Sequence, residues 1–348
     1  MPTPSPLAWF DTHLDLACMA RTGRDMYSPD LATCGGQELP AAATLPSLAA
    51  GNVKWCLATI FTEANGKDAI GYPAGDAAAA RARGMEQMAV YEQWERDGWI
   101  SRWGGGMKRG AGAKANAMGV GILIEGADPV TTPDELAWWV DRGVVAMGLA
   151  WARSSRYAGG NMTDEPLTDL GRAMIREMDR LGVVHDVSHL SDVALAELFT
   201  LAEKPVIASH SNCRALIDVD GERRQRHLTD ETIETIGRRG GMIGVNVFSK
   251  FIIPGAKDDR RATLAEWAAH VNHICQVQRR RDRVGLGTDM DGGFSAAKMP
   301  EGIDKPADLH RLAEALAGTG WSDAEVRGFA SENWLRFWRA RHAALIAE

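Results

Sequence analysis

The sequence predicts an α/β fold, an eight-stranded parallel (β/α)8 TIM barrel with extra loops and a C-terminal helix, as one domain over residues 1–348. Three observations predict it: eight short apolar runs recur along the chain, helix-like stretches separate most of them, and no low-complexity linker marks a second domain. Strands that alternate with helices are typical of a parallel sheet with right-handed crossovers. Eight repeats favour closure into a barrel over an open sheet, which more usually has about six strands.

Each predicted strand is a short apolar run that ends in polar residues or glycine. Such runs, bounded by turn residues and separated by helical patterns, indicate strands of an alternating α/β fold. The eight runs cover residues 7–15, 53–61, 120–126, 144–151, 183–189, 205–211, 242–248 and 283–289.

Capping residues mark the helices between these strands. Thr132 and Pro133 open one helix, acidic residues follow in its first turn, and Gly143 ends it. A second helix ends at Gly182 with Arg180 in its last turn. These residue types are preferred at helix ends. The same pattern predicts helices within 191–204, 228–241, 263–281 and 322–348, a short helix within 37–51, and a flexible connector over 101–119.

Composition narrows the partners and the compartment. The net charge of −7 argues against nucleic acid or an anionic membrane as the main partner. Five scattered cysteines without CxxC spacing fit a reducing compartment rather than a disulfide framework. The segment before Asp11 lacks the regions of a signal peptide, and no stretch approaches the roughly 18 apolar residues of a membrane span. We therefore expect a cytoplasmic protein with no nucleic-acid or membrane partner.

Ionisable residues stand where the predicted strands end. The opening stretch FDTHLDLACMA carries Asp11, His13 and Asp15 at every second position. On a surface strand this alternation would only face water. In a closed barrel, side chains at i and i+2 share a face, so His13 and Asp15 would both point to the mouth. The ends of four other predicted strands carry Glu125, His189, His210 and Asp289.

This set of residues predicts a metal centre. Each one alone has a structural explanation, such as a hydrogen-bonded histidine or a carboxylate that caps a helix. Together, ionised groups at one mouth must be paired or coordinated. Imidazoles with carboxylates suit Zn²⁺, and five ligands exceed the three that one catalytic zinc normally keeps. We therefore expect two zinc ions per chain that share a carboxylate and a hydroxide, a charge arrangement that favours hydrolysis.

Asp289 remains available for proton transfer. A carboxylate at the end of the eighth strand could take a proton from water and pass it to a leaving nitrogen. The alternative is that Asp289 only orients a ligand histidine. Asp11 and Asp291 are interpreted as structural groups rather than ligands.

The motifs DTHLDL, IEGAD, DVSH, ASHSNCR, RHLTDE and GLGTDMDGG, in this order, resemble the renal (membrane) dipeptidase family of zinc peptidases, within the amidohydrolase-type barrels. The resemblance covers the chain from about Phe10 to the C-terminal helix. It implies that His13 and Asp15 bind one zinc ion and that His189 and His210 bind the other. It further implies that Glu125 bridges the two ions and that Asp289 transfers the proton.

The resemblance also implies a substrate-binding arginine. The family places an arginine before an LTDE-like helix start to hold the free carboxylate of the substrate. Arg226 in RQRHLTDE matches that position, followed by His227 where the family usually has asparagine. A guanidinium group suits a carboxylate. Arg214, Arg223 and Arg224 are nearby competitors.

One substrate-binding position departs from the family pattern. Many members carry a histidine at the end of the fourth strand that contacts the scissile carbonyl, and Trp151 stands there instead. Tryptophan has one donor, no acceptor and a larger volume. Arg153 or Arg156 could replace the lost positive charge. The sequence therefore predicts an intact metal site beside an altered substrate pocket.

The leading functional hypothesis is a dinuclear zinc dipeptidase that cleaves small dipeptides with a metal-bridging hydroxide. The resemblance allows a D-residue on the carboxyl side of the substrate. One alternative is a related amidohydrolase that acts on another N-acyl or cyclic amide, and another is a catalytically inactive binding barrel. The tryptophan-rich C-terminal helix, with Trp334 and Trp338, can pack on the barrel or on the second subunit of a homodimer.

Overall fold

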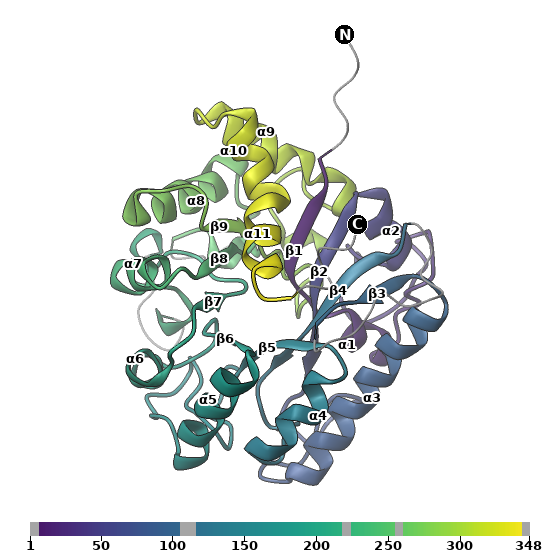
Figure 1. The fold of residues 1–348 in the computed structure, drawn as a ribbon. Helices are drawn as coiled ribbons and strands as arrows, with labels where there is room; N and C mark the ends of the chain where they lie inside the picture. The colour runs from purple at the N-terminus through teal and green to yellow at the C-terminus, as the bar shows by residue number, and fades with distance from the viewer. Residues whose placement is uncertain (1–6, 105–115, 218–223, 255–259, 343–348) are drawn as a thin grey trace.

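Eight parallel strands close into a barrel in the computed structural model, which describes residues 7–104, 116–217, 224–254 and 260–342. Neighbouring strands follow the order β2-β1-β9-β8-β7-β6-β5-β4, and pairing of β2 with β4 closes the ring (Figure 1). The predicted (β/α)8 barrel is therefore confirmed. The eight strands are β1 (Trp9–Leu14), β2 (Val53–Phe61), β4 (Met118–Glu125), β5 (Val144–Gly148), β6 (Val184–Asp186), β7 (Val206–Ala208), β8 (Met242–Val245) and β9 (Val284–Leu286).

A ninth strand, β3 (Ile100–Arg102), lies beside the start of β4 and outside the ring. It pairs with Met118–Val120, whereas β5 pairs with the later residues Ile122–Glu125. The predicted connector over 101–119 is wrong at both ends, since it overlaps β3 and the start of β4. Its central residues, 105–115, lie outside the described part of the chain. Three residues are too few to reveal a strand by periodicity.

Helices surround the ring of strands (Figure 1). The predicted end of the second helix is confirmed at α5, which Gly182 ends at φ 75°, and at its start the Thr168 hydroxyl accepts a hydrogen bond from the Gly171 amide. Ser191, Thr229 and Thr263 cap three later helices in the same way. The helices are α1 (Leu16–Arg21), α2 (Leu45–Ala50), α3 (Ala77–Arg96), α4 (Leu136–Val140), α5 (Asp169–Leu181), α6 (Asp192–Leu201), α7 (Asp230–Arg238), α8 (Leu264–Gln278), α9 (His310–Gly318), α10 (Asp323–Arg327) and α11 (Asn333–Arg339).

The C-terminal helix packs on the barrel of its own chain. A π-helical turn over Gly328–Glu332 joins α10 to α11, and residues 343–348 lie outside the described part. Trp334 and Trp338 are fully buried. Trp334 lies 6.3 Å from Phe10 of β1 between ring centroids. The helix therefore covers the amino-terminal end of the barrel, opposite the mouth, and a homodimer stays a prediction.

Within the described part of the chain, none of the helices combines the length and the apolar character that crossing a membrane requires.

Candidate metal centre

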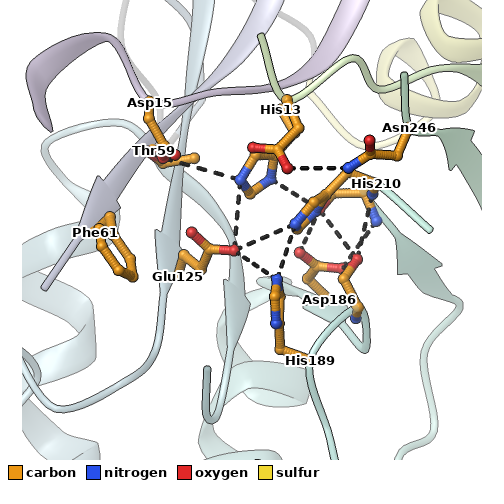
Figure 2. Close-up of polar contacts among 12 residues, drawn as sticks. His13, Asp15, Thr59, Phe61, Glu125, Asp186, His189, His210 and Asn246 are labelled. Carbon is orange, nitrogen blue, oxygen red and sulfur yellow. Dashed lines mark hydrogen bonds and ion pairs between the residues drawn. The ribbon is translucent and has the colours of Figure 1, made fainter. Parts of the chain in front are cut away.

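All six residues predicted for the centre meet at the carboxyl-terminal mouth of the barrel, and Figure 2 shows the candidate ligands among them. Each side chain comes from the end of a strand or from the first residues after it. This is the face on which barrel enzymes carry their active sites. The contributing residues are His13 from β1, Asp15 after β1, Glu125 from β4, His189 after β6, His210 after β7 and Asp289 after β9.

Three imidazole nitrogens surround one carboxylate oxygen. The Oε1 atom of Glu125 lies 3.4 Å from Nε2 of His13, 3.1 Å from Nε2 of His189 and 3.4 Å from Nε2 of His210. The Nε2 atoms of His189 and His210 are 2.9 Å apart. Asp15 approaches from the other side, with its Oδ1 3.9 Å from Nε2 of His13.

Hydrogen bonds around the rings fix which nitrogen faces the centre. The Ser209 hydroxyl donates its one proton to Asp186 at 2.6 Å, so it can only accept from His13 and His210. It lies 3.1 Å from Nδ1 of His13 and 2.7 Å from Nδ1 of His210. In the neutral, metal-binding form, both rings therefore carry the proton on Nδ1 and turn an Nε2 lone pair toward Glu125.

The donor set fits a cation. Nε2 of His13 and Oε1 of Glu125 are buried and have no hydrogen-bond partner among the described residues. Lone pairs and a carboxylate that face each other without a donor are costly when buried. Two overlapping groups each bring ligand atoms within 4.8 Å of one another: His13, Glu125 and His210, and His13, Asp15 and Asp289. Nitrogen and carboxylate ligands of this kind suit Zn²⁺ and similar cations.

Electrostatics agree with this fit. Burial alone lowers the pKa of His13, but Glu125, Asp15 and Asp289 outweigh burial and raise that pKa to about 10. Burial and the neighbouring charge of Glu125 raise the pKa of Asp15 to about 6. The protein groups alone therefore hold an excess of negative charge and attract positive charge. Burial lowers the pKa of His189 to about 4, which leaves its ring neutral and able to bind a metal.

Asp289 lies close enough to the centre for either predicted role. Its Oδ2 accepts a hydrogen bond of 2.9 Å from the Asn246 amide, and burial raises its pKa well above the ordinary value. Gly292 makes room for this carboxylate, because a Cβ atom there would lie 1.9 Å from Oδ1 of Asp289. Proton transfer by Asp289 and its alternative role, orientation of a ligand histidine, both stay predictions.

Asp11 and Asp291 lie outside the two ligand groups, in keeping with their structural interpretation. Asp11 accepts hydrogen bonds from the Thr288 amide at 2.8 Å and from the His13 amide at 3.2 Å. Asp291 forms a buried ion pair with Arg24.

Several partners of the candidate ligands were not foreseen from the sequence. Ser209 and Asp186 hold the imidazoles, as described above, and Thr59 donates a hydrogen bond to Asp15. Asn161 accepts from Nδ1 of His189 at 2.9 Å. Such outer contacts orient ligands and tune a bound metal. Asp186 had a detectable signal, because it ends β6 in the same motif as His189.

A cavity of about 290 Å³ opens onto the centre, and both predicted substrate-binding residues, Arg226 and Trp151, line it. Arg226 is buried; its guanidinium donates to the His210 carbonyl at 2.7 Å and to the Ser211 hydroxyl at 3.1 Å. Its Nε has no partner among the described residues. The competing Arg214 is bound instead to Asp192, at 2.6 and 2.8 Å. Arg223 and the side chain of Arg224 lie outside the described residues.

Trp151 forms part of the cavity wall. Its ring lies 5.0 Å from that of Phe61 and 6.0 Å from that of His189. Neither predicted replacement for the lost positive charge is among the described residues that line this cavity. Arg156 donates to the Thr131 carbonyl at 3.1 Å, and Arg153 is exposed.

This protein is a parallel barrel with imidazoles and carboxylates within ligand distance of one another at its mouth. That combination is typical of metal-dependent hydrolases. The family model of the membrane dipeptidases, peptidase family M19, matches residues 5–346. The chain belongs to this family.

Relatives and solved structures agree with the family. A Schizosaccharomyces pombe protein described as an uncharacterized dipeptidase is 32% identical over 180 residues, which are 52% of this chain and 41% of that protein. The chain spans about half the length, or less, of the curated relatives that it matches. Dipeptidase AC, a metallopeptidase of family M19, superposes with a TM-score of 0.80 at 22% identity, over 97% of this chain and 99% of that one. A Rhodobacter sphaeroides metallopeptidase bound to a phosphinate mimic of L-Ala-D-Ala gives 0.79 at 22% identity, over 95% and 98%.

Proposed function

We propose that this protein is a dinuclear zinc dipeptidase that cleaves the amide bond of small dipeptides. One observation carries the proposal: three imidazole Nε2 atoms lie within 3.4 Å of one buried carboxylate oxygen of Glu125. In the proposed centre, His13 and Asp15 hold one ion and His189 and His210 hold the other. Glu125 and a hydroxide are shared between the ions. When bound, such a pair polarises a carbonyl group and activates water.

Arg226 is proposed to hold the carboxylate of the substrate. Its buried guanidinium lines the cavity beside His210 and donates to the His210 carbonyl at 2.7 Å. A charge-assisted hydrogen bond to a carboxylate is strong in such a desolvated place. A dipeptide bound by Arg226 would extend across the metal centre, which puts its amide bond over Glu125.

Asp289 is proposed to move the proton. The Asn246 amide holds one of its oxygens, and its carboxylate lies within 4.8 Å of the ligand atoms of Asp15 and His13. A carboxylate held in this way can accept a proton from the attacking water and give it to the leaving nitrogen.

We propose that at least some of the dipeptide substrates carry a D-residue on their carboxyl side. A structurally similar metallopeptidase binds a phosphinate mimic of L-Ala-D-Ala, which supports this choice. The alternative of another N-acyl or cyclic amide rests on Trp151, which narrows the cavity next to His189.

The test combines metal analysis with a substrate panel on the zinc-loaded protein. We expect two zinc ions per chain, and turnover of L,L- or L,D-dipeptides that weakens when the terminal carboxylate is converted to an amide. Two zinc ions with turnover of other amides only would support the amidohydrolase alternative. A protein that binds no zinc and turns over neither class would overturn the proposal. Glu314→Gln, an exposed change on α9, serves as the control variant.

A further inference from the structure

Besides Asp291, which is paired with Arg24, three carboxylates outside the metal centre line the same cavity: Glu38, Glu63 and Asp68. We refer to these three residues as the acidic rim. Glu63 and Asp68 lie in the connection from β2 to α3, and Glu38 lies between α1 and α2. Within the described part of the chain, none of the three forms an ion pair with a basic side chain. Arg24, which is paired with Asp291, lies near Glu38 and acts to lower its pKa without forming an ion pair with it.

The acidic rim and Arg226 lie on opposite sides of the mouth. Arg226 belongs to the connection that follows β7, whereas Glu63 follows β2. Around the ring, β2 and β7 are separated by three strands in either direction, which places them across the barrel from each other. A short ligand that starts at Arg226 and crosses the centre therefore ends beside the acidic rim.

The buried cationic end of this cavity is an independent sign of a ligand. Arg226 is only 4% exposed, and its Nε lacks a partner among the described residues. Arg226 also lines the cavity, and a buried guanidinium attracts an incoming carboxylate. One end of the cavity thus fits an anion, and the other end carries negative charge.

The pKa shifts of two residues on the β1–β2 side of the cavity, Cys18 and Glu38, agree with negative charge at this end. Burial raises the pKa of the Cys18 thiol, and Asp15, Glu125, Asp68 and Glu38 raise it further. Burial and the charge of Asp291 also raise the pKa of Glu38. Burial is the largest cause of both shifts, and the neighbouring carboxylates add to it, while Arg24 acts in the opposite direction on Glu38.

Apolar side chains line the same cavity as the acidic rim. Phe61, Ile70 and Trp151 line the cavity together with Glu63. The methylene stem of a long basic side chain can lie along such a surface while its charged end reaches carboxylates. Trp151 additionally offers an aromatic face to a guanidinium or ammonium group.

We propose that the cavity selects dipeptides whose amino-terminal residue has a basic side chain, with the charged end of that side chain at the acidic rim. This inference rests on the proposed function, since it assumes that Arg226 holds the other end of the substrate. The α-amino group is common to all dipeptides, so the selectivity concerns the side chain alone.

The test compares L-lysyl-D-alanine with L-norleucyl-D-alanine, which differ only in the terminal ammonium group. We expect kcat/KM to be about 10-fold higher for the lysyl substrate at low salt, because several weak carboxylate–ammonium attractions add up. The combined variant Glu38→Gln, Glu63→Gln, Asp68→Asn should bring this ratio to within about twofold, and Glu314→Gln should leave it unchanged. Raising the salt concentration should lower the ratio in the wild type only.

Binding of phosphinate mimics of the two dipeptides, measured by calorimetry, gives a second readout without turnover. The lysyl mimic should bind more tightly to the wild type and lose that advantage in the combined variant. Equal affinities and equal kcat/KM for the two side chains would overturn the inference while the proposed function stands. Absence of turnover for both substrates would overturn the proposed function, and the ratio of affinities would still decide the inference.

Discussion

At the scale of single residues, Ser209 controls how two candidate ligands face the centre. Its oxygen accepts from Nδ1 of both His13 and His210 while its proton goes to Asp186. Ser209→Ala removes these contacts, so either ring can turn or move its proton to Nε2. We expect zinc affinity to fall about 10- to 100-fold with the fold retained. Competition with a chelator at fixed pH measures the change.

Ser188 provides the matched control for Ser209. Its hydroxyl donates to the same Asp186 carboxylate at 2.7 Å, but it forms no hydrogen bond to an imidazole nitrogen among the described residues. Ser188→Ala should leave zinc affinity close to that of the wild type. An equal loss in both variants would mean that Asp186, rather than the orientation of the rings, decides affinity.

A substitution at Asp289 should lower turnover without loss of bound zinc. Asp289→Asn keeps the size of the side chain but cannot accept a proton as a carboxylate does. We expect both zinc ions to remain bound and kcat to fall about 10²- to 10⁴-fold. Zinc content and dipeptide turnover of the same preparation provide the measurement. Loss of one zinc ion in this variant would show instead that Asp289 is a ligand, and unchanged kcat would refute both roles.

The sequence predicts the candidate ligands but not the residues that orient them. His13, Glu125 and Asp289 stand at strand ends, and the barrel topology brings strand ends together whatever their separation in the chain. Asn161 has no such signal, because it lies in a loop 28 residues before His189 and meets it only through folding. Its role depends on loop conformation, which periodicity does not encode.

At the scale of elements, strand β3 and helix α3 are absent from the elements named in the sequence prediction, because each has a weak local signal. β3 has three residues, and α3 carries Gly84 in its interior, where glycine weakens a helix. A Cβ atom at Gly84 would lie 2.8 Å from Pro129. The glycine therefore allows α3 to pack closely against the loop after β4. Close packing of this kind depends on a partner element, so the local sequence cannot reveal it.

Helix α8 contributes a pH dependence through His270, which is buried away from the centre. Its Nδ1 accepts the Cys213 amide at 3.1 Å and its Nε2 donates to the Ile252 carbonyl at 3.0 Å. Burial lowers the pKa of His270 to about 4 from the ordinary 6.5. Between these values the unfolded chain binds the proton more readily, so acid destabilises the fold. From pH 7 to pH 5 this group alone should remove about 2 kcal/mol of unfolding free energy.

The variant His270→Asn tests this contribution, because its side chain does not titrate in this range. It should be less stable than the wild type at pH 7, since the two hydrogen bonds no longer fit. The difference between the two proteins should shrink by about 2 kcal/mol at pH 5. Urea unfolding at both pH values gives the difference. A gap that stays constant with pH would contradict a lowered pKa at His270.

At the scale of the whole molecule, the two ends of the barrel have separate tasks. Strand β1 carries Phe10 toward the amino-terminal end and His13 at the mouth. Phe10 packs with Trp103 and Trp334, which belong to one aromatic cluster with α11. In barrels of this kind the mouth supports chemistry and the opposite end supports stability. The covering helix should therefore affect unfolding without affecting the metal centre.

Trp334 is the residue at which this separation can be measured. It is fully buried, and β9 has Gly285 beside it, where a Cβ atom would lie 2.4 Å from the indole nitrogen. Trp334→Ala should lower the unfolding free energy by about 3 to 5 kcal/mol, because the covering helix loses a fully buried indole that packs against the strands. Trp334→Phe should cost less, since it fills most of the same space. For whichever variant is folded at the assay temperature, zinc content and kcat should equal those of the wild type. A fall in kcat for the folded Trp334→Phe variant would show instead that the two ends of the barrel are coupled through the strands that join them.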